Sequence, residues 1–119
     1  MAFLPSDTEL EVSSANAAAA NNQTLAAAAT LRTYITGFTV TGGGATAASV
    51  IAVTVTGLAT TLTFHVPIPA GATVGVVPLV VQFARPIPAS ADNTAIVVNV
   101  PSFGAGNTQA SATATGFQR

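Results

Sequence analysis

The feature of this sequence that most constrains its fold is a strict alternation of apolar and polar side chains in short runs. In Thr61–Val66 every second side chain is Leu, Phe or Val, and Ser49–Thr56 alternates in the same way with Ile and Val. Successive side chains of a β-strand point to opposite faces, so each run predicts a strand with one buried face. The short stretch Gly57–Ala59 between the two runs is a turn signal. Together they predict an antiparallel hairpin.

Four more segments predict strands, from their β-branched and aromatic residues or from simple alternation. They are Thr30–Thr41, Val74–Phe83, Ala95–Val100 and Thr108–Phe117. The second of them is apolar on both faces and contains Pro78, which indicates an edge or a bulge; an edge strand covered by a neighbouring subunit would satisfy both observations. In the last, alanine at every second position predicts close approach of the opposite sheet or of another subunit. We therefore expect about six to eight strands in an all-β fold: an antiparallel β-sandwich, jelly-roll-like or Ig-like, or a small barrel.

Glycine and proline mark the connections between these strands. Pro67–Gly71 and Arg85–Ala89 each contain two prolines, which lack the N–H that a sheet ladder needs, so both are predicted to be loops. Gly42–Gly44 and Pro101–Asn107 are predicted to be glycine-rich turns.

The first 23 residues differ from the remainder, because they hold three of the four acidic side chains. We expect residues 1–23 to form an extended N-terminal arm, with a helical turn as an option at Ala17–Ala20, and residues 24–119 to form one β-sandwich domain. The acids in the arm recur with period two, which is typical of an edge strand laid on a surface. A frayed terminus is the alternative. The candidate docking residues for a partner are Asp7, Glu9, Leu10, Glu11 and Val12.

The chain is also exceptionally poor in charge. Charged residues make up 6% of it, against about 25% in an ordinary soluble domain. A monomer of this mass would expose about 5,900 Å², which leaves about 800 Å² per charge, the area that one partner buries in a standard interface. The net charge of −1 gives copies of the chain almost no mutual repulsion. We expect a subunit of a larger assembly that associates with itself; a monomer wetted by hydroxyl and amide groups is the alternative.

The same shortage of charge disfavours most chemistry. The chain has no cysteine and a single histidine, His65, and the only carboxylate beyond the arm is Asp92. Neither a catalytic constellation nor a closed metal site is expected from such a set, so we predict no enzyme activity, no cofactor, no metal and no small-molecule substrate. Three dispersed arginines do not predict nucleic-acid binding; each is expected to have a specific partner such as a carboxylate of the arm, with plain solvation as the alternative. The sequence shows neither the features of a secretory signal nor an apolar segment of about 20 residues, so we predict no contact with a membrane.

Several stretches of the sequence resemble small uncharacterised structural proteins of tailed phages and prophages. They are Arg32–Phe38, Thr41–Val50, Ile87–Ile96 and Gly116–Gln118. The resemblance brings no functional residues with it. It implies a virion component assembled in the host cytoplasm, most simply a head decoration (cement) protein. Such proteins are small β modules, often trimers, that bind the major capsid protein or another virion protein.

Two other functions stay open from the sequence. The first is a tail, fibre or adhesin module that binds a host receptor or glycan. The absence of tryptophan and the presence of only one tyrosine weigh against it, because sugar sites usually use aromatic platforms. The second is a bacterial structural subunit unrelated to phages.

Overall fold

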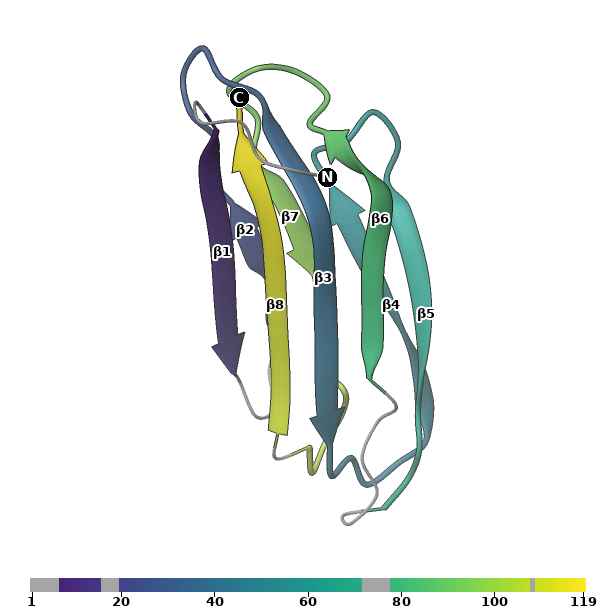
Figure 1. Ribbon diagram of the computed structural model, residues 1–119. Helices are drawn as coiled ribbons and strands as arrows, with labels where there is room; N and C mark the ends of the chain where they lie inside the picture. Colours follow the sequence, from purple (N-terminus) through teal and green to yellow (C-terminus); the bar gives the residue numbers. More distant parts are fainter. Residues whose placement is uncertain (1–6, 16–19, 72–77, 108) are drawn as a thin grey trace.

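The structure is a computed structural model, and it describes residues 7–15, 20–71, 78–107 and 109–119. Within these residues the regular structure is entirely β, and two four-stranded antiparallel sheets pack together (Figure 1). The strands are β1 (Thr8–Ala15), β2 (Gln23–Leu25), β3 (Thr33–Gly43), β4 (Ser49–Thr56), β5 (Leu62–Ile68), β6 (Leu79–Pro88), β7 (Ile96–Asn99) and β8 (Gln109–Gln118). The predicted all-β antiparallel architecture is therefore confirmed.

The strand order follows one simple rule. Sheet A has the order β1-β8-β3-β6 and sheet B has the order β2-β7-β4-β5. The outermost strands of the chain pair with each other, β1 with β8, and the pairs β2–β7, β3–β6 and β4–β5 are nested inside them. Successive nested pairs fall alternately in sheet A and sheet B. The sandwich thus has two open sides, which we call the β1/β2 side and the β5/β6 side (Figure 1).

The core lies between the sheets and is built from the inward face of each strand. Because side chains alternate along each strand, every second one points into the core. The inner strands β3, β4 and β7 contribute fully buried Ile and Val side chains. Ala110, Ala112 and Ala114 of β8 are buried in this core, so the alanine stripe faces the opposite sheet. Towards the β5/β6 side the packing becomes aromatic. The Phe38 and Phe64 rings meet edge to face at 5.4 Å between centroids, and Phe83 lies 6.4 Å from Phe38.

A buried polar cluster joins the two sheets at the β1/β2 side. The side-chain amide of Gln23 on β2 donates to the Ser14 hydroxyl of β1 at 2.5 Å and to the Asn21 carbonyl oxygen at 2.8 Å. The amide nitrogen of Asn21 donates to the backbone carbonyl of Ser14 at 3.1 Å. Because no buried side-chain N or O atom among the described residues lacks a hydrogen-bond partner, these hydrogen bonds offset the cost of burying Asn21 and Gln23.

Strand β6 is bulged against β3. Ile35 pairs with Ile87 and Gly37 pairs with Gln82, so four residues of β6, Phe83–Pro86, lie opposite Thr36 alone. A side chain at Gly37 would not fit, because a Cβ there would lie 2.6 Å from the carbonyl oxygen of Val81. The bulge therefore depends on glycine at this position and pushes Phe83–Pro86 away from the ladder.

The hairpin prediction is confirmed. Of the two predicted proline loops, Pro67–Gly71 is wrong for its first two residues only, because β5 ends at Ile68, whereas Arg85–Ala89 is wrong for most of its length, because β6 extends to Pro88. β4 and β5 pair from Val55–Leu62 to Ser49–Ile68. β5 runs through Pro67, which pairs with Val50, and β6 runs through Pro86 and Pro88. Both strands are edges of their sheets, so the missing N–H can face away from the neighbouring strand.

The structure also bears on the predicted turn at Gly42–Gly44 and on the predicted strand Val74–Phe83. β3 continues to Gly43, so the expected turn at Gly42–Gly44 begins later than predicted. β6 is an edge strand, as predicted from Pro78, and Val80 on it is 62% exposed in the single chain; its cover by a neighbouring subunit stays a prediction. Part of the predicted strand Val74–Phe83 and the helical turn at Ala17–Ala20 lie largely outside the described residues.

Candidate interaction surface

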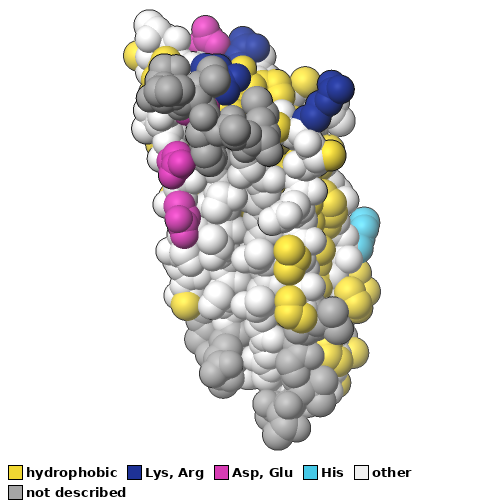
Figure 2. Space-filling view, in the orientation of Figure 1, with side chains coloured by type: hydrophobic (Ala, Val, Ile, Leu, Met, Phe, Trp, Pro, Cys, Tyr) yellow, Lys and Arg dark blue, Asp and Glu magenta, His cyan; other side chains and the backbone are white. Residues whose placement is uncertain are grey.

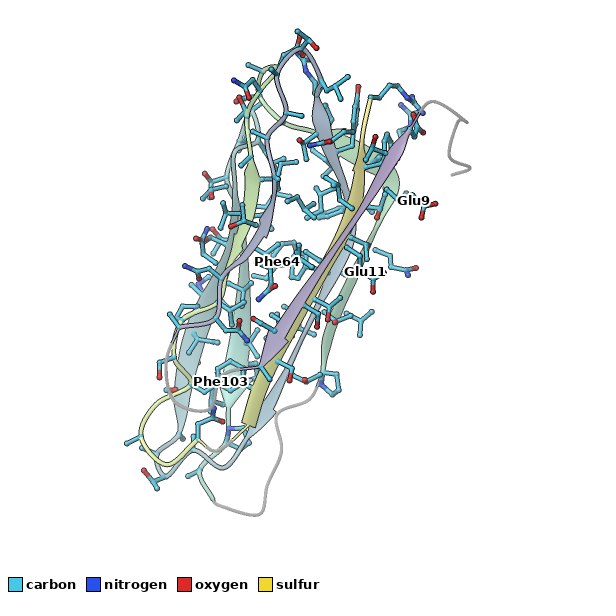
Figure 3. The ribbon with its side chains drawn as sticks, turned by 90° about the vertical axis from the view of Figure 1, so that its left-hand side faces the viewer. Glu9, Glu11, Phe64 and Phe103 are labelled. Atoms are coloured by element: carbon cyan, nitrogen blue, oxygen red, sulfur yellow. The ribbon has the colours of Figure 1, made fainter. Side chains whose placement is uncertain are left out.

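The candidate docking residues lie on β1, the edge strand of sheet A that pairs with β8 along its whole length. Leu10 and Val12 are half-buried and pack against the core, whereas Glu9 and Glu11 are exposed. Figure 3 shows these two acids projecting from the outer side of sheet A, while Phe64 lies between the sheets. The period-two pattern thus divides the segment into two anchoring side chains and two solvent-facing carboxylates.

Asp7 has a different role, because it forms a bidentate ion pair with Arg119. The Arg119 Nε and Nη2 atoms donate to the two carboxylate oxygens at 2.9 and 3.0 Å. These hydrogen bonds raise the pKa of Arg119 above its usual value. The guanidinium lies 5.1 Å from the ring centroid of Phe117, which stacks on Tyr34 at 4.9 Å. This contact ties the beginning of β1 to the end of β8.

The other arginines behave differently from each other. Arg32 donates to Asp92 at 3.1 Å, so the predicted specific partners are confirmed for Arg32 and Arg119. Arg85 lies in the bulge of β6 and is exposed, and within the described residues it has no hydrogen bond or ion pair. In Figure 2 the cationic side chains gather at one end of the molecule.

The β5/β6 side carries most of the exposed apolar surface. Figure 2 shows hydrophobic side chains along the edge where Figure 1 places β6 and β5. Phe64, Val81 and Phe83 are only half-buried there, and Val80 is largely exposed. The outer faces of both sheets are instead rich in hydroxyl groups, such as the Ser13–Thr113 pair at 2.8 Å and the Thr36–Thr115 pair at 2.9 Å. Apart from Val50 on β4, which is 65% exposed, the exposed apolar side chains thus gather on one side of the sandwich.

Two hollows flank the β6 bulge. One, of about 400 Å³, lies over β3, β6 and β8 and is lined mainly by Phe38, Phe83, Gln82 and neighbouring threonines. The other, of about 390 Å³, is lined by Tyr34, Ala84, Arg85, Pro86 and Phe117. Neither contains a cluster of groups suited to catalysis. Both are places where a side chain of a partner could be received.

All four strand edges have a feature that discourages uncontrolled pairing with other chains. β1 carries Glu9 and Glu11, and β2 is only three residues long. β5 contains Pro67, and β6 contains Pro86, Pro88 and the bulge. Charge, shortness, proline and bulges are the usual means of edge protection. The first four residues of β6, Leu79–Gln82, have none of them and form an unprotected stretch of edge.

The residues that carry catalytic chemistry in other proteins are dispersed here. His65 is exposed at the middle of β5 opposite Ala52, and Asp92 is engaged by Arg32. No group of three or more His, Cys, Asp or Glu residues that could hold a metal ion is found among the described residues. In the same part of the chain, no helix has the length and apolar character needed to cross a membrane.

Sequence reasoning did not anticipate the bulge, the unpaired Arg85 or the hollows. The pattern Arg85-Pro86-Ile87-Pro88 indicates a loop as readily as a bulged edge strand, and only the strand order distinguishes the two. Searches against protein-family models, curated proteins and solved structures find no match to this chain.

Proposed function

We propose that this chain is a non-enzymatic structural subunit of a phage virion, acting as a capsid decoration (cement) protein through protein–protein contacts. The observation that carries the proposal is the character of its surface, which is nearly uncharged and has an apolar β5/β6 side with an unprotected stretch of edge at Leu79–Gln82. Such a surface can be buried against protein at little cost in charge desolvation. The assignment to phages rests on the sequence resemblance described above.

The nested strand order supports a finer description of the fold as a jelly roll. Pairing β1–β8, β2–β7, β3–β6 and β4–β5 makes the chain one long hairpin that is rolled up, so that alternate pairs enter alternate sheets. Eight-stranded jelly rolls occur in viral capsid domains and also in lectins and cupins. The fold is therefore compatible with the proposal, although a shared fold is an analogy and does not define a function.

The N-terminal arm is proposed to act through its exposed carboxylates. Glu9 and Glu11 would contact the partner, which is a neighbouring copy of the chain or a capsid protein, while Leu10 and Val12 hold the strand against the core. Because β1 pairs with β8 over eight positions, removing residues 1–23 would also remove an edge of sheet A. Point substitutions therefore test the docking role more cleanly than truncation.

The test is co-sedimentation with capsids of the phage or prophage that carries the gene for this chain. We expect saturable binding with a fixed number of copies per capsomer, and weaker binding for Glu9→Gln/Glu11→Gln. Ala47→Gln, at an exposed position outside the strands, is the control and should bind as the parent chain does. An absence of binding at tens of micromolar would reject the decoration role.

A module that binds a host glycan or receptor is the second candidate. The hollow beside Tyr34 and Arg85 favours it, because it combines an aromatic ring with a hydrogen-bond donor. Specific hits on a glycan array, lost in Tyr34→Ala, would establish this function and displace the first.

A further inference from the structure

Three charged side chains of the described residues take no part in an internal ion pair. The chain has three arginines and four acids, and all seven lie in the part that the structure describes. Asp7–Arg119 and Asp92–Arg32 pair internally. Glu9, Glu11 and Arg85 remain without an ionic partner among the described residues. The two acids lie on β1 and the arginine on β6, so they occupy the opposite edges of sheet A.

We propose that copies of this chain associate side by side, with the β5/β6 side of one copy against the β1/β2 side of the next. The interface joins two different surfaces of the same chain, so it is heterologous and generates a ring or a filament. This inference goes beyond the proposed function: it rests on the self-association predicted from the scarcity of charge, and it specifies the surfaces and the residues.

Strand direction permits the contact. The four strands of sheet A alternate in direction, because each neighbouring pair is antiparallel. β1 and β6 therefore run in opposite directions (Figure 1). A copy placed beside the first without rotation sets its β1 antiparallel to β6, which continues the alternation of the sheet.

The register of sheet A places the complementary charges at the same height. Glu11 is level with Thr115, Gly37 and Gln82 across the four strands, and Glu9 is level with Phe117, Tyr34 and Pro88. Arg85 lies between Gln82 and Pro88 on β6. It lines a hollow with Tyr34 and Phe117, whose cross-strand partner is Glu9. A neighbouring copy at the same height would thus bring Glu9 and Glu11 next to Arg85.

The unprotected part of β6 meets a suitable strand in this arrangement. Following the register across the sheet, Leu79 would face Ser14 of the next copy, Val80 would face Ser13, Val81 would face Val12 and Gln82 would face Glu11. Neither of these four-residue stretches contains proline, so both can supply a backbone ladder. Val80 would lose its exposure. Pro86 and Pro88 prevent pairing farther along β6, where Arg85 makes the contact instead.

A side-by-side neighbour fits the β5/β6 side better than a copy related by a two-fold axis does. In a two-fold pairing of β6 with β6, Arg85 meets no acid, and Glu9 and Glu11 stay exposed on the far edge. The side-by-side arrangement places the remaining arginine beside the two remaining acids, with a net charge of −1 left per copy, and covers the exposed apolar edge in one contact. The positions of the charges and of the apolar edge therefore favour a heterologous interface over a two-fold one.

Charge reversal with mixing tests the interface. Arg85→Glu alone and Glu9→Arg/Glu11→Arg alone are expected to weaken self-association at least tenfold in multi-angle light scattering, with thermal stability close to that of the parent chain. An equimolar mixture of the two variants should associate again, because each then presents the charge that the other needs. Ala47→Glu, which adds a single negative charge at an exposed position between β3 and β4, should leave self-association unchanged.

A cross-link tests the register independently of charge. The chain contains no cysteine, so Val80→Cys/Ser13→Cys introduces the only thiols. Facing residues of adjacent strands lie within disulfide reach, and mild oxidation should give a ladder of covalent multimers. Val80→Cys/Ala47→Cys should not. A parent chain that is monomeric at hundreds of micromolar, or charge variants that fail to complement each other, would overturn the interface; capsid binding is measured separately and would still test the decoration role.

Discussion

The backbones of β8 and β3 approach each other at Gly116 more closely than any larger residue permits. A Cβ at this position would overlap the carbonyl oxygen of Tyr34 and would lie 3.0 Å from the Leu25 side chain. We expect Gly116→Ala to lower the free energy of unfolding by about 1–3 kcal/mol, the usual cost of overpacking. Urea denaturation measures this. Ser111→Ala, at an exposed position of the same strand, should change it by less than about 0.5 kcal/mol.

The polar cluster at the β1/β2 side offers a second test at this scale. Asn21 accepts from both Ser14 and Gln23, and its amide is buried. Asn21→Ala removes that acceptor and leaves buried donors with fewer partners, so we expect a loss of about 1–3 kcal/mol in unfolding free energy. Thr24→Ala, exposed on β2, is the matched control. Equal stability of the two variants would show that the cluster does not hold the sheets together.

Single residues differ in how much of their role the sequence reveals. The outward direction of Glu9 and Glu11 follows from period two, and the scarcity of charge predicts partners for Arg32 and Arg119. The position of Arg85 opposite these acids could not be predicted. It depends on which strands lie at the two edges of sheet A, and no local pattern encodes that.

At the scale of elements, the alternation of apolar and polar side chains predicts strands well, whereas proline leads to parts of edge strands being predicted as loops. The β4–β5 hairpin was predictable because both strands bury one face and expose the other. The segments at Pro67 and at Pro86–Pro88 were predicted to be loops because proline breaks a ladder on two sides. Edge strands need a ladder on one side only, and a sequence does not show which strands are edges.

Pro67 is therefore expected to protect the edge of β5. We expect Pro67→Thr to keep the fold and its stability, while restoring an N–H that faces solvent and favouring pairing with other chains. Light scattering during prolonged incubation should show faster aggregation than in the parent chain. Pro69→Thr lies just beyond the strand and should aggregate at the parental rate. Equal rates for the two variants would contradict a protective role of Pro67.

At the scale of the whole molecule, the nested pairing is what the sequence conceals. Alternation assigns each side chain to a face, but it does not say which strand lies beside which. β1 and β8 pair although Asp7 and Arg119 are 112 positions apart. The long axis of the molecule, 46 Å against 23 and 22 Å, follows from strands that all run nearly along it (Figure 1).

This nesting predicts an order of folding. The β4–β5 hairpin closes a short loop, whereas β1–β8 closes nearly the whole chain, so the inner pair should form first. Val53→Ala, in the buried centre of β4, is expected mainly to slow refolding; Val12→Ala, on β1, should mainly speed unfolding. Stopped-flow chevron plots separate the two effects. The reverse assignment would mean that the outer strands nucleate the fold.

The ion pair between Asp7 and Arg119 also has a mechanical consequence. Thr8 is level with Gln118, so tension applied through these two points would peel β1 from β8 and load their hydrogen bonds one after another. Tension applied between Ala15 and Gln118, at opposite ends of the same ladder, would load those bonds together in shear. The force needed to separate β1 from β8 should therefore be lower when tension is applied at Thr8 and Gln118 than when it is applied at Ala15 and Gln118. A subunit held in a shell under internal pressure would withstand most force if its load entered at the Ala15 end of the sandwich.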